Sequence, residues 1–165
     1  MAQRPLSKID HLLLGVDKAL RAVVPHSNPS TRPLPVSSDE IPELSITEAR
    51  HVAGLMRINH TGEVCAQGLY HGQAFAAKDD NVKQAMQQSA EEEVDHLVWC
   101  EVRLDELGSH PSIFTPLWYG MSFGLGAVAG AISNEFSLGF VAETEAQVSE
   151  HLQDHIGQLP PQDKR

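Results

Sequence analysis

Glu93 and His96 are the residues whose types and spacing point most directly to chemistry. In a helix, side chains three residues apart lie one turn apart on the same face. This face is expected to be buried, because mostly apolar positions recur along it at intervals of three and four. They are Val82, Met86, Ser89, Leu97, Cys100, Leu104 and Leu107. Glu91, Glu92 and Asp95 fall outside this stripe, and we expect them to face water. A buried carboxylate needs a partner, and a metal ion is one suitable partner.

Glu63 and Glu145 occupy similar positions in two other expected helices. The inner face around Glu63 contains Val52, Leu55, Asn59, Gly62, Ala66, Tyr70 and Gln73. The stripe around Glu145 contains Leu138, Val141, Val148, Leu152, Ile156 and Leu159. A carboxylate-rich site with imidazole suits Fe or Mn, and suits Zn less well without thiolates. The matching design is the two-metal site of ferritin-like bundles, in which two helices each supply a Glu and two each supply Glu-x-x-His.

Two helices joined by a short turn must position most of these side chains. Ser45-Ile-Thr-Glu48 forms a capping box that starts a helix running to about Ala77. The next helix begins with Asp80 or Asn81 as its N-cap and ends at Gly108. The short turn predicts that the two helices are antiparallel. Several glycines in the first helix indicate close approach of a neighbouring helix or a ligand: Gly54, Gly62, Gly68 and Gly72.

Residues 113–134 contain no charged side chain, so their length alone would permit a membrane span of ~20 residues. Glycines and serines lower the hydropathy of this segment, and Trp118 and Tyr119 lie near one end as interfacial anchors do. We therefore expect a helix that packs on the bundle on one side. Its other side would face a bilayer surface or a lipid-like ligand. A deeply buried core helix is the alternative.

Composition divides the chain into an amphipathic N-terminal helix (1–24), a Pro-rich linker (25–44) and a helical domain (45–165). The N-terminal helix holds the basic part of the chain, which fits contact with a membrane surface. Packing of this helix on the domain is the alternative. We expect the linker to be extended and to carry no chemistry.

The overall composition excludes some classes of protein. A net charge of −10 argues against nucleic acid as a partner. Ala, Leu, Glu and Gln predominate, which favours an all-α fold. Cys65 and Cys100 form no CxxC pair and suit free thiols in a reducing compartment. Asp10 and Asp17 flank the apolar run at 12–14 too closely for a secretory signal.

Several motifs, in order and spacing, resemble the Coq7 family of demethoxyubiquinone hydroxylases, the 2-polyprenyl-3-methyl-6-methoxy-1,4-benzoquinone monooxygenases. They are Arg57-Ile-Asn-His-Thr-Gly-Glu63, Glu93-Val-Asp-His96, Pro116-Leu-Trp-Tyr-Gly120 with Gly124-Leu-Gly-Ala127, and Glu145 with His151. The resemblance runs from Ser45 to Leu159. It implies a ferritin-like di-iron carboxylate helical bundle and a monooxygenase of ubiquinone biosynthesis. Such an enzyme hydroxylates the ring of a demethoxyubiquinol precursor with O₂.

The resemblance also implies roles for single residues. Glu63 and His96 would bind one iron, Glu93 would bridge both irons, and Glu145 would bind the second, giving two Fe ions per chain. Residues expected around these ligands are Asn59, Tyr70 and His151. Residues expected to face the substrate or the membrane are Trp118, Phe123, Gly124 and Gly126. The quinol ring would reach the irons along residues 113–134.

The family continues with a fourth core helix carrying a second Glu-x-x-His, whereas this sequence stops at Arg165. We therefore expect a truncated bundle that lacks the last core helix and two iron ligands. The implied location is peripheral, on the cytoplasmic face of the inner membrane, with a polyprenyl quinol and O₂ as partners. A homo-oligomer or a biosynthetic complex stays open. Two other functions also stay open: a non-catalytic membrane-associated quinone- or lipid-binding remnant, and a ferritin-like protein that handles iron or peroxide.

Overall fold

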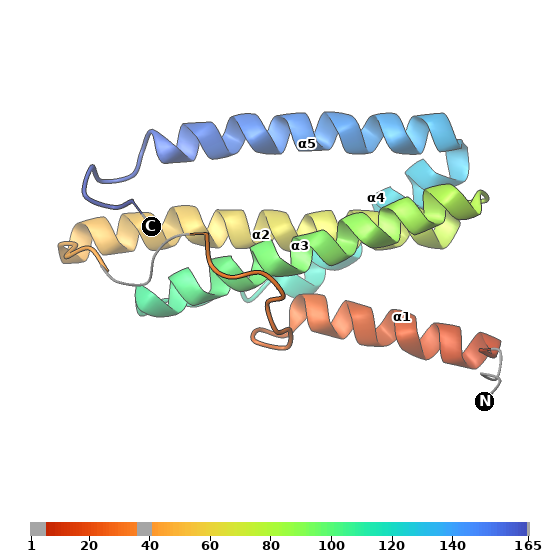
Figure 1. The fold of residues 1–165 in the computed structure, drawn as a ribbon, viewed down its shortest axis with the longest axis horizontal. Coiled ribbons are helices and arrows are strands. Elements are labelled where there is room, and N and C mark those ends of the chain that lie inside the picture. Colours follow the sequence, from red (N-terminus) through yellow and green to blue (C-terminus); the bar gives the residue numbers. More distant parts are fainter. Residues whose placement is uncertain (1–5, 36–40, 165) are drawn as a thin grey trace.

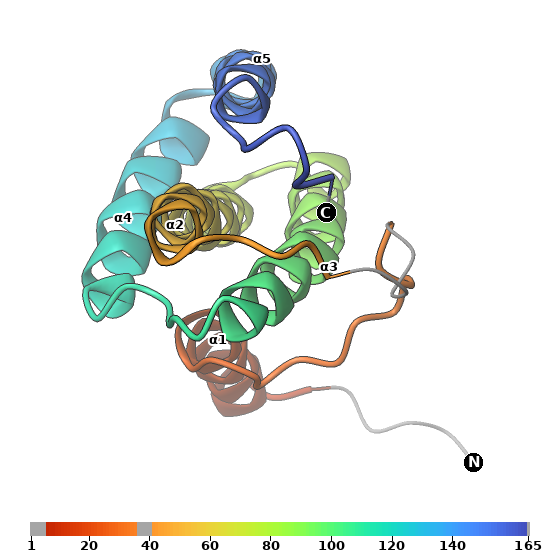
Figure 2. The same ribbon diagram turned by 90° about the vertical axis from the view of Figure 1, so that its left-hand side faces the viewer.

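The structure, a computed structural model, describes residues 6–35 and 41–164. Within these ranges the chain is all-helical, as predicted, and Figure 1 shows its helices in sequence order. They are α1 (Lys8–Val23), α2 (Ile46–Ala76), α3 (Asp80–Glu106), α4 (Thr115–Ile132) and α5 (Asn134–Ile156). Seen end-on in Figure 2, α2 lies in the middle, with α4 on one side and α3 on the other. The long helix α2 is therefore the element on which the others are placed.

The helix ends follow the local sequence closely. At the start of α2, the Glu48 backbone N–H donates to Ser45 Oγ (3.3 Å) and the Ser45 N–H donates to Glu48 Oε2 (2.8 Å), so the predicted capping box is confirmed. The N-cap of α3 is Asp79, which precedes both predicted candidates and accepts two backbone N–H bonds. Gly108 follows α3 with φ +61°, the left-handed conformation that commonly ends a helix.

Helices α2 and α4 pack closely against each other because glycines of both helices lie at their contact. A Cβ atom on Gly72 would overlap the Phe123 carbonyl oxygen and lie 2.7 Å from the Ala127 nitrogen. A Cβ atom on Gly126 would overlap the carbonyl oxygen of Leu69. Similar close approaches occur at Gly68 and Gly130. The absence of side chains at these positions lets two backbones pack directly, which fixes α4 against α2.

The prediction of close approach is correct for only half of the α2 glycines. Gly54 and Gly62 face open space, with nothing within 4 Å of an added Cβ atom. The expectation that Gly126 faces substrate or membrane is also wrong, because this residue is buried against α2. Helical periodicity can distinguish glycines that face a partner helix from glycines that face open space only when the position of the partner helix is known.

Helix α5 differs most from its predicted packing. Its apolar stripe was expected to be buried, but Leu138, Val148, Leu152 and Ile156 are 36–69% exposed. Hydrogen bonds hold this part of the chain at several points, including the start of α5 and the residues beyond its end. Gln73 Nε2 donates to the Ser137 carbonyl oxygen (2.9 Å) near the start of α5, and Arg103 Nη2 donates to Asp163 Oδ2 (2.7 Å) just beyond it. Few close contacts join α5 to α2, which leaves much of the stripe open.

Helix α1 and the chain that follows it pack on the other helices. Ala22 contributes to a small core with Val64, Leu97 and Tyr119. Many apolar side chains of α1 are nevertheless exposed: Ile9, Leu12, Leu13, Leu14, Val16 and Leu20. Residues 24–35 then run back along α3, and the His26 backbone N–H donates to Glu101 Oε2 (3.1 Å). Part of the predicted linker is therefore attached to the bundle.

Helix α4 is half buried, which agrees with the expected two-sided helix and not with the deep-core alternative. Its inner residues include Tyr119, Ala129 and Gly130. Its outer face carries exposed apolar side chains: Leu117, Trp118, Met121, Leu125, Val128 and Ile132. Among the residues that the structure describes, none of the helices combines the length and hydropathy needed to cross a membrane.

Candidate metal centre

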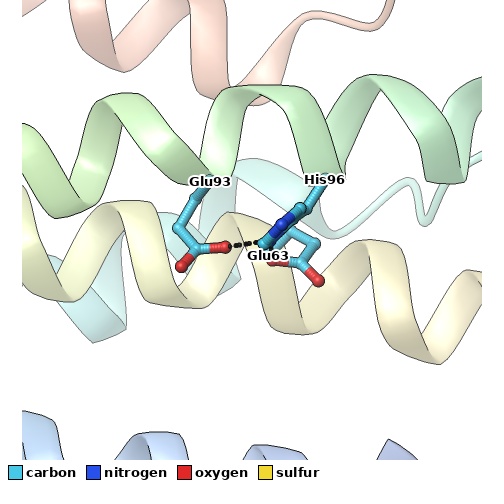
Figure 3. A group of neighbouring side chains, drawn as sticks. All are labelled: Glu63, Glu93 and His96. Atoms are coloured by element: carbon cyan, nitrogen blue, oxygen red, sulfur yellow. Dashed lines mark hydrogen bonds and ion pairs between the residues drawn. The ribbon is translucent and has the colours of Figure 1, made fainter. Parts of the chain in front are cut away.

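The structure brings Glu63 of α2 together with Glu93 and His96 of α3 (Figure 3). One potential ligand atom from each residue lies within 4.8 Å of the others. His96 Nδ1 is 2.8 Å from Glu93 Oε2 and 3.9 Å from Glu63 Oε2. The two carboxylate side chains are 14% and 13% exposed, and the imidazole is 40% exposed. Two carboxylates and one imidazole thus converge on a small, half-buried volume, as predicted from their positions on the apolar stripes.

The electrostatics of this cluster favour a cation. Burial and the neighbouring carboxylates of Glu93 and Glu145 raise the pKa of Glu63 to about 9. The pKa of Glu93 is lowered despite its burial, because His96 and Glu63 hydrogen-bond to its carboxylate. The hydrogen bond to Glu93 in turn raises the pKa of His96. A divalent cation would relieve the repulsion between the carboxylates, so these donors fit iron.

Glu145 faces the same region from α5 but is not part of the group of three. The Tyr70 hydroxyl donates a hydrogen bond to Glu145 Oε1. Burial and this contact raise the pKa of Tyr70, so the phenol keeps its proton. Glu145 itself belongs to the exposed residues of α5, contrary to the expectation that it is buried. The openness of α5 explains the difference: the carboxylate reaches Tyr70 of α2, but α5 itself stands off the bundle.

Of the two other residues expected around the ligands, Asn59 lines a cavity together with Glu63 and His96 and also contacts α5, whereas His151 lies near the end of α5. The Asn59 side-chain oxygen is 2.7 Å from His155 Nδ1. His151 is exposed, and its ring lies 4.0 Å from that of His155, centroid to centroid. His155, which was not proposed as a site residue, is therefore the buried histidine of this pair.

A cavity of about 280 Å³ opens beside the ligand cluster. Its lining includes Glu63 and His96, together with Trp99, Cys100 and Leu152. These residues come from α2, α3 and α5, and Leu34 and Pro35 also contribute. None of the residues lining it belongs to 113–134, so the expected approach of substrate along that segment does not match the position of this cavity.

The remaining residues expected to face substrate or membrane lie away from the cluster. Trp118 is 37% exposed on the outer face of α4, and Gly124 is also exposed. Phe123 is half buried and packs with Phe75 and Tyr119. It lines a second, larger groove of about 790 Å³ between α1, α2, α3 and α4.

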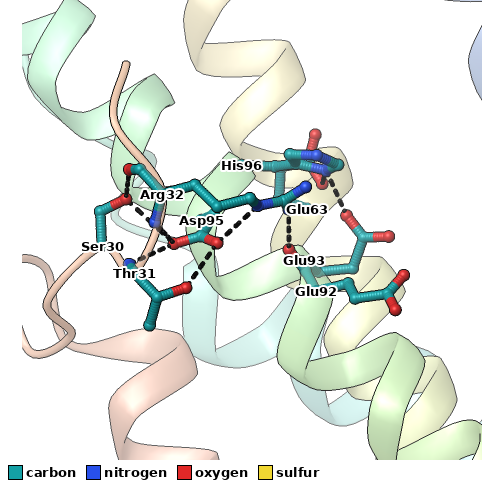
Figure 4. Close-up of polar contacts among 8 residues, drawn as sticks. All are labelled: Ser30, Thr31, Arg32, Glu63, Glu92, Glu93, Asp95 and His96. Carbon is teal, nitrogen blue, oxygen red and sulfur yellow. Dashed lines mark hydrogen bonds and ion pairs between the residues drawn. The ribbon is translucent and has the colours of Figure 1, made fainter. Parts of the chain in front are cut away.

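Sequence reasoning missed a group of residues behind the ligands (Figure 4). Asp95 was expected to face water, but it is 3% exposed and accepts hydrogen bonds from Ser30, Thr31 and Arg32. Burial disfavours its charge, but these bonds outweigh burial and hold the pKa of Asp95 well below its usual range. The segment 30–32 belongs to the linker that was expected to carry no chemistry. The partners of Asp95 lie more than sixty positions away in the sequence. The sequence therefore carries no signal for these contacts beyond the position of Asp95 next to a proposed ligand.

Comparison with known proteins identifies relatives of the chain. Residues 50–165 match the family model described as "Ubiquinone biosynthesis protein COQ7". The chain is 94% identical to a 3-demethoxyubiquinol 3-hydroxylase of Psychrobacter arcticus over 165 residues, which is all of this chain and 77% of the relative. It is 58% identical to the protein of the same name from Stutzerimonas stutzeri over 164 residues, which is 99% of this chain and 76% of the relative. No solved structure gives a significant match.

The chain has the helical carboxylate–histidine site of a candidate metalloprotein, and it belongs to the COQ7 family. It spans about three quarters of the length of the relatives that it matches.

Proposed function

We propose that this protein is a 3-demethoxyubiquinol 3-hydroxylase, which adds a hydroxyl group from O₂ to the ring of a demethoxyubiquinol precursor in ubiquinone biosynthesis. Its family membership and the names of its relatives support this reaction. The structural observation that supports it most strongly is the convergence of Glu63, Glu93 and His96 on one half-buried volume.

Glu63 and His96 would hold one iron, Glu93 would bridge to a second, and Glu145 would contribute to that second position. Bound iron supplies the electrons that activate O₂. The protein's own part is to keep the two carboxylates at close range and to orient His96 through its bond to Glu93. Tyr70 holds Glu145 by its hydroxyl and fixes the direction of that carboxylate.

The cavity beside the ligands is the proposed site of the quinol ring. Its walls are mainly apolar, since Met56, Trp99, Cys100 and Leu152 contribute to them. Such a wall would exclude water from the reacting ring and from the metal ligands. The ring would enter from the side of α3 and α5, and not along α4.

The exposed apolar side chains of α1 and α4 support peripheral contact with a membrane, and we propose the cytoplasmic face of the inner membrane as the location. These two helices lie next to each other, and both present exposed apolar side chains. The groove between them also carries Lys18 and Lys83, which suit anionic lipid headgroups.

Turnover provides the main test. The chain, loaded with Fe²⁺ and supplied with a reductant and O₂, should convert a short-tailed demethoxyubiquinol to a product with one more oxygen atom, measured by mass spectrometry. Glu63→Gln should reduce the product to background, whereas Glu91→Gln, at an exposed position of α3, should leave it unchanged. Iron without hydroxylation would instead favour a ferritin-like protein, and quinol binding without iron would favour a binding protein.

Vesicle binding tests the membrane surface separately. Leu125→Glu with Val128→Glu should reduce co-sedimentation with anionic vesicles, because charge on an interfacial apolar face is unfavourable. Ile58→Glu, at an exposed apolar position of α2, is the matched control. Equal loss in both variants would contradict a specific role for α4.

A further inference from the structure

The segment 30–35, here called the strap, crosses the helix that supplies two of the proposed ligands. It is fixed to α3 by Asp95, which is almost fully buried. Asp95 Oδ1 accepts from the Ser30 hydroxyl (2.9 Å) and the Thr31 backbone N–H (2.6 Å). Asp95 Oδ2 accepts from the Thr31 hydroxyl (2.9 Å) and Arg32 Nε (2.8 Å). So many bonds to a single carboxylate, from consecutive residues, give the strap a defined position on α3.

Arg32 connects the strap to the metal ligands (Figure 4). Besides Asp95, its guanidinium donates to the Glu92 carbonyl oxygen (3.2 Å). Its central carbon lies 5.3 Å from the centre of the Trp99 ring, a cation–π distance. The Trp99 ring lies 5.2 Å from that of His96, centroid to centroid. Arg32 therefore touches α3 at three points that surround both of its proposed ligands.

The His96 ring needs such support. Its side chain is 40% exposed, and its hydrogen bond is to Glu93, which is itself a proposed ligand. The indole of Trp99 packs against the ring, and Arg32 covers the indole. Residues that surround and orient a metal ligand commonly change metal affinity by 10–100-fold when they are replaced. The planar guanidinium suits this role, since it can stack on the indole while it donates to Asp95 and Glu92.

From this chain of contacts we infer that Arg32 is a positioning residue of the metal centre. It holds Trp99 against His96 and so fixes the orientation of the imidazole, while Asp95 anchors the strap that delivers it. This inference rests on the proposed metal centre. It goes beyond that centre by giving the strap, which is distant in sequence, a part in metal binding.

Titration with Co²⁺ tests the inference without turnover. The visible absorption of bound Co²⁺ reports both the affinity and the ligand geometry at the site. Arg32→Ala should weaken Co²⁺ binding by about tenfold and change the absorption spectrum. Arg32→Lys keeps the charge but loses the planar fork, so it should remain weakened to a similar degree. Arg21→Ala is the matched control, because it removes an exposed ion pair with Asp17 elsewhere in the N-terminal part.

A fluorescence measurement verifies the physical step between Arg32 and the site. The chain has two tryptophans, so Trp118→Phe leaves Trp99 as the remaining tryptophan, which can be excited selectively, apart from the tyrosines, at about 295 nm or above. Adding Arg32→Ala to this background should increase quenching of Trp99 by acrylamide. If Arg32→Ala does not fold, Trp99→Leu provides the second variant, and it should weaken Co²⁺ binding about as much.

The outcomes separate the two proposals. Unchanged Co²⁺ affinity and spectrum in Arg32→Ala, or full recovery in Arg32→Lys, would overturn the positioning role and leave the metal centre intact. Loss of affinity without any change in Trp99 quenching would also overturn it. A wild-type chain that binds no Co²⁺ would overturn the metal centre and the positioning role together.

Discussion

The two sides of α2 are built in opposite ways. Toward α4, glycines such as Gly68 and Gly72 bring the two backbones into direct contact. Toward α3 and α5, the same helix presents Glu63 and Tyr70, whose polar groups meet other side chains and not a backbone. The two sides of α2 therefore have different roles. The close backbone contact between α2 and α4 at these glycines, here called the seam, fixes the position of α2. The other side of the helix can then hold carboxylates at a definite separation.

Breaking the seam should have the largest effect. Gly72→Ala would place a methyl group against the Phe123 carbonyl oxygen and 2.7 Å from the Ala127 nitrogen. Backbone atoms cannot move aside as a flexible side chain does, so we expect a loss of about 3 kcal/mol in the free energy of unfolding. Urea denaturation of the metal-free chain measures it. Gly54→Ala, in open space on the same helix, is the control, and an equal loss there would contradict the seam.

Replacing the titratable carboxyl group of Glu63, on the opposite side of α2, should stabilise the metal-free chain. The pKa of Glu63 in the folded chain, about 9, lies above its usual value of 4.5. The folded state therefore holds this proton more tightly than the unfolded state, and stability falls as the pH rises from about 4.5 to 9. Glu63→Gln should remove this dependence and stabilise the metal-free chain at pH 8 by roughly 1–3 kcal/mol.

Thermal unfolding at several pH values checks this effect, with Glu91→Gln as the exposed control. The stabilisation by bound metal should depend on pH in the opposite direction. The wild-type chain should gain stability from Fe²⁺ or Co²⁺, and gain more as the pH rises, because the metal competes with protons for the carboxylates. Glu63→Gln should lose most of that gain. A wild-type chain whose metal-free stability does not fall with pH would contradict the electrostatics described for the cluster.

Two tyrosines, one hydrogen-bonded on each side of α2, provide a comparison in which the expected change in stability is smaller. Tyr70 donates to Glu145 on the metal side, whereas Tyr119 bonds to His71 Nδ1 (2.9 Å) on the α4 side. Replacing either by Phe should cost about 1 kcal/mol, since one buried hydrogen bond is lost. Only Tyr70→Phe should also weaken Co²⁺ binding, as measured by calorimetry. Equal effects on Co²⁺ binding would mean that the sides are not independent.

The sequence reveals those parts of this structure that local patterns encode. The capping box at Ser45 and the buried positions of Glu63 and Glu93 follow from spacing alone, because helical period and caps are local properties. The contacts of Asp95 could not be predicted in this way, because its partners lie in the strap, at a distance along the chain that no periodicity covers. The exposed stripe of α5 could not be predicted either, because an apolar stripe indicates which side is available for packing but not how closely a partner approaches.

The smallest expected effect concerns a glycine beside the ligand itself. Gly62 precedes Glu63, yet a Cβ atom there would meet nothing within 4 Å. Gly62→Ala should therefore stabilise the chain by about 0.5–1 kcal/mol, because alanine loses less backbone entropy in a helix. The sign is opposite to that of Gly72→Ala, although the same helix and the same substitution are involved. Urea denaturation measures the stability and a Co²⁺ titration the affinity, which should not change. Destabilisation by Gly62→Ala would mean that a neighbour packs closely on this side of α2 as well, and the contrast between its two sides would then be lost.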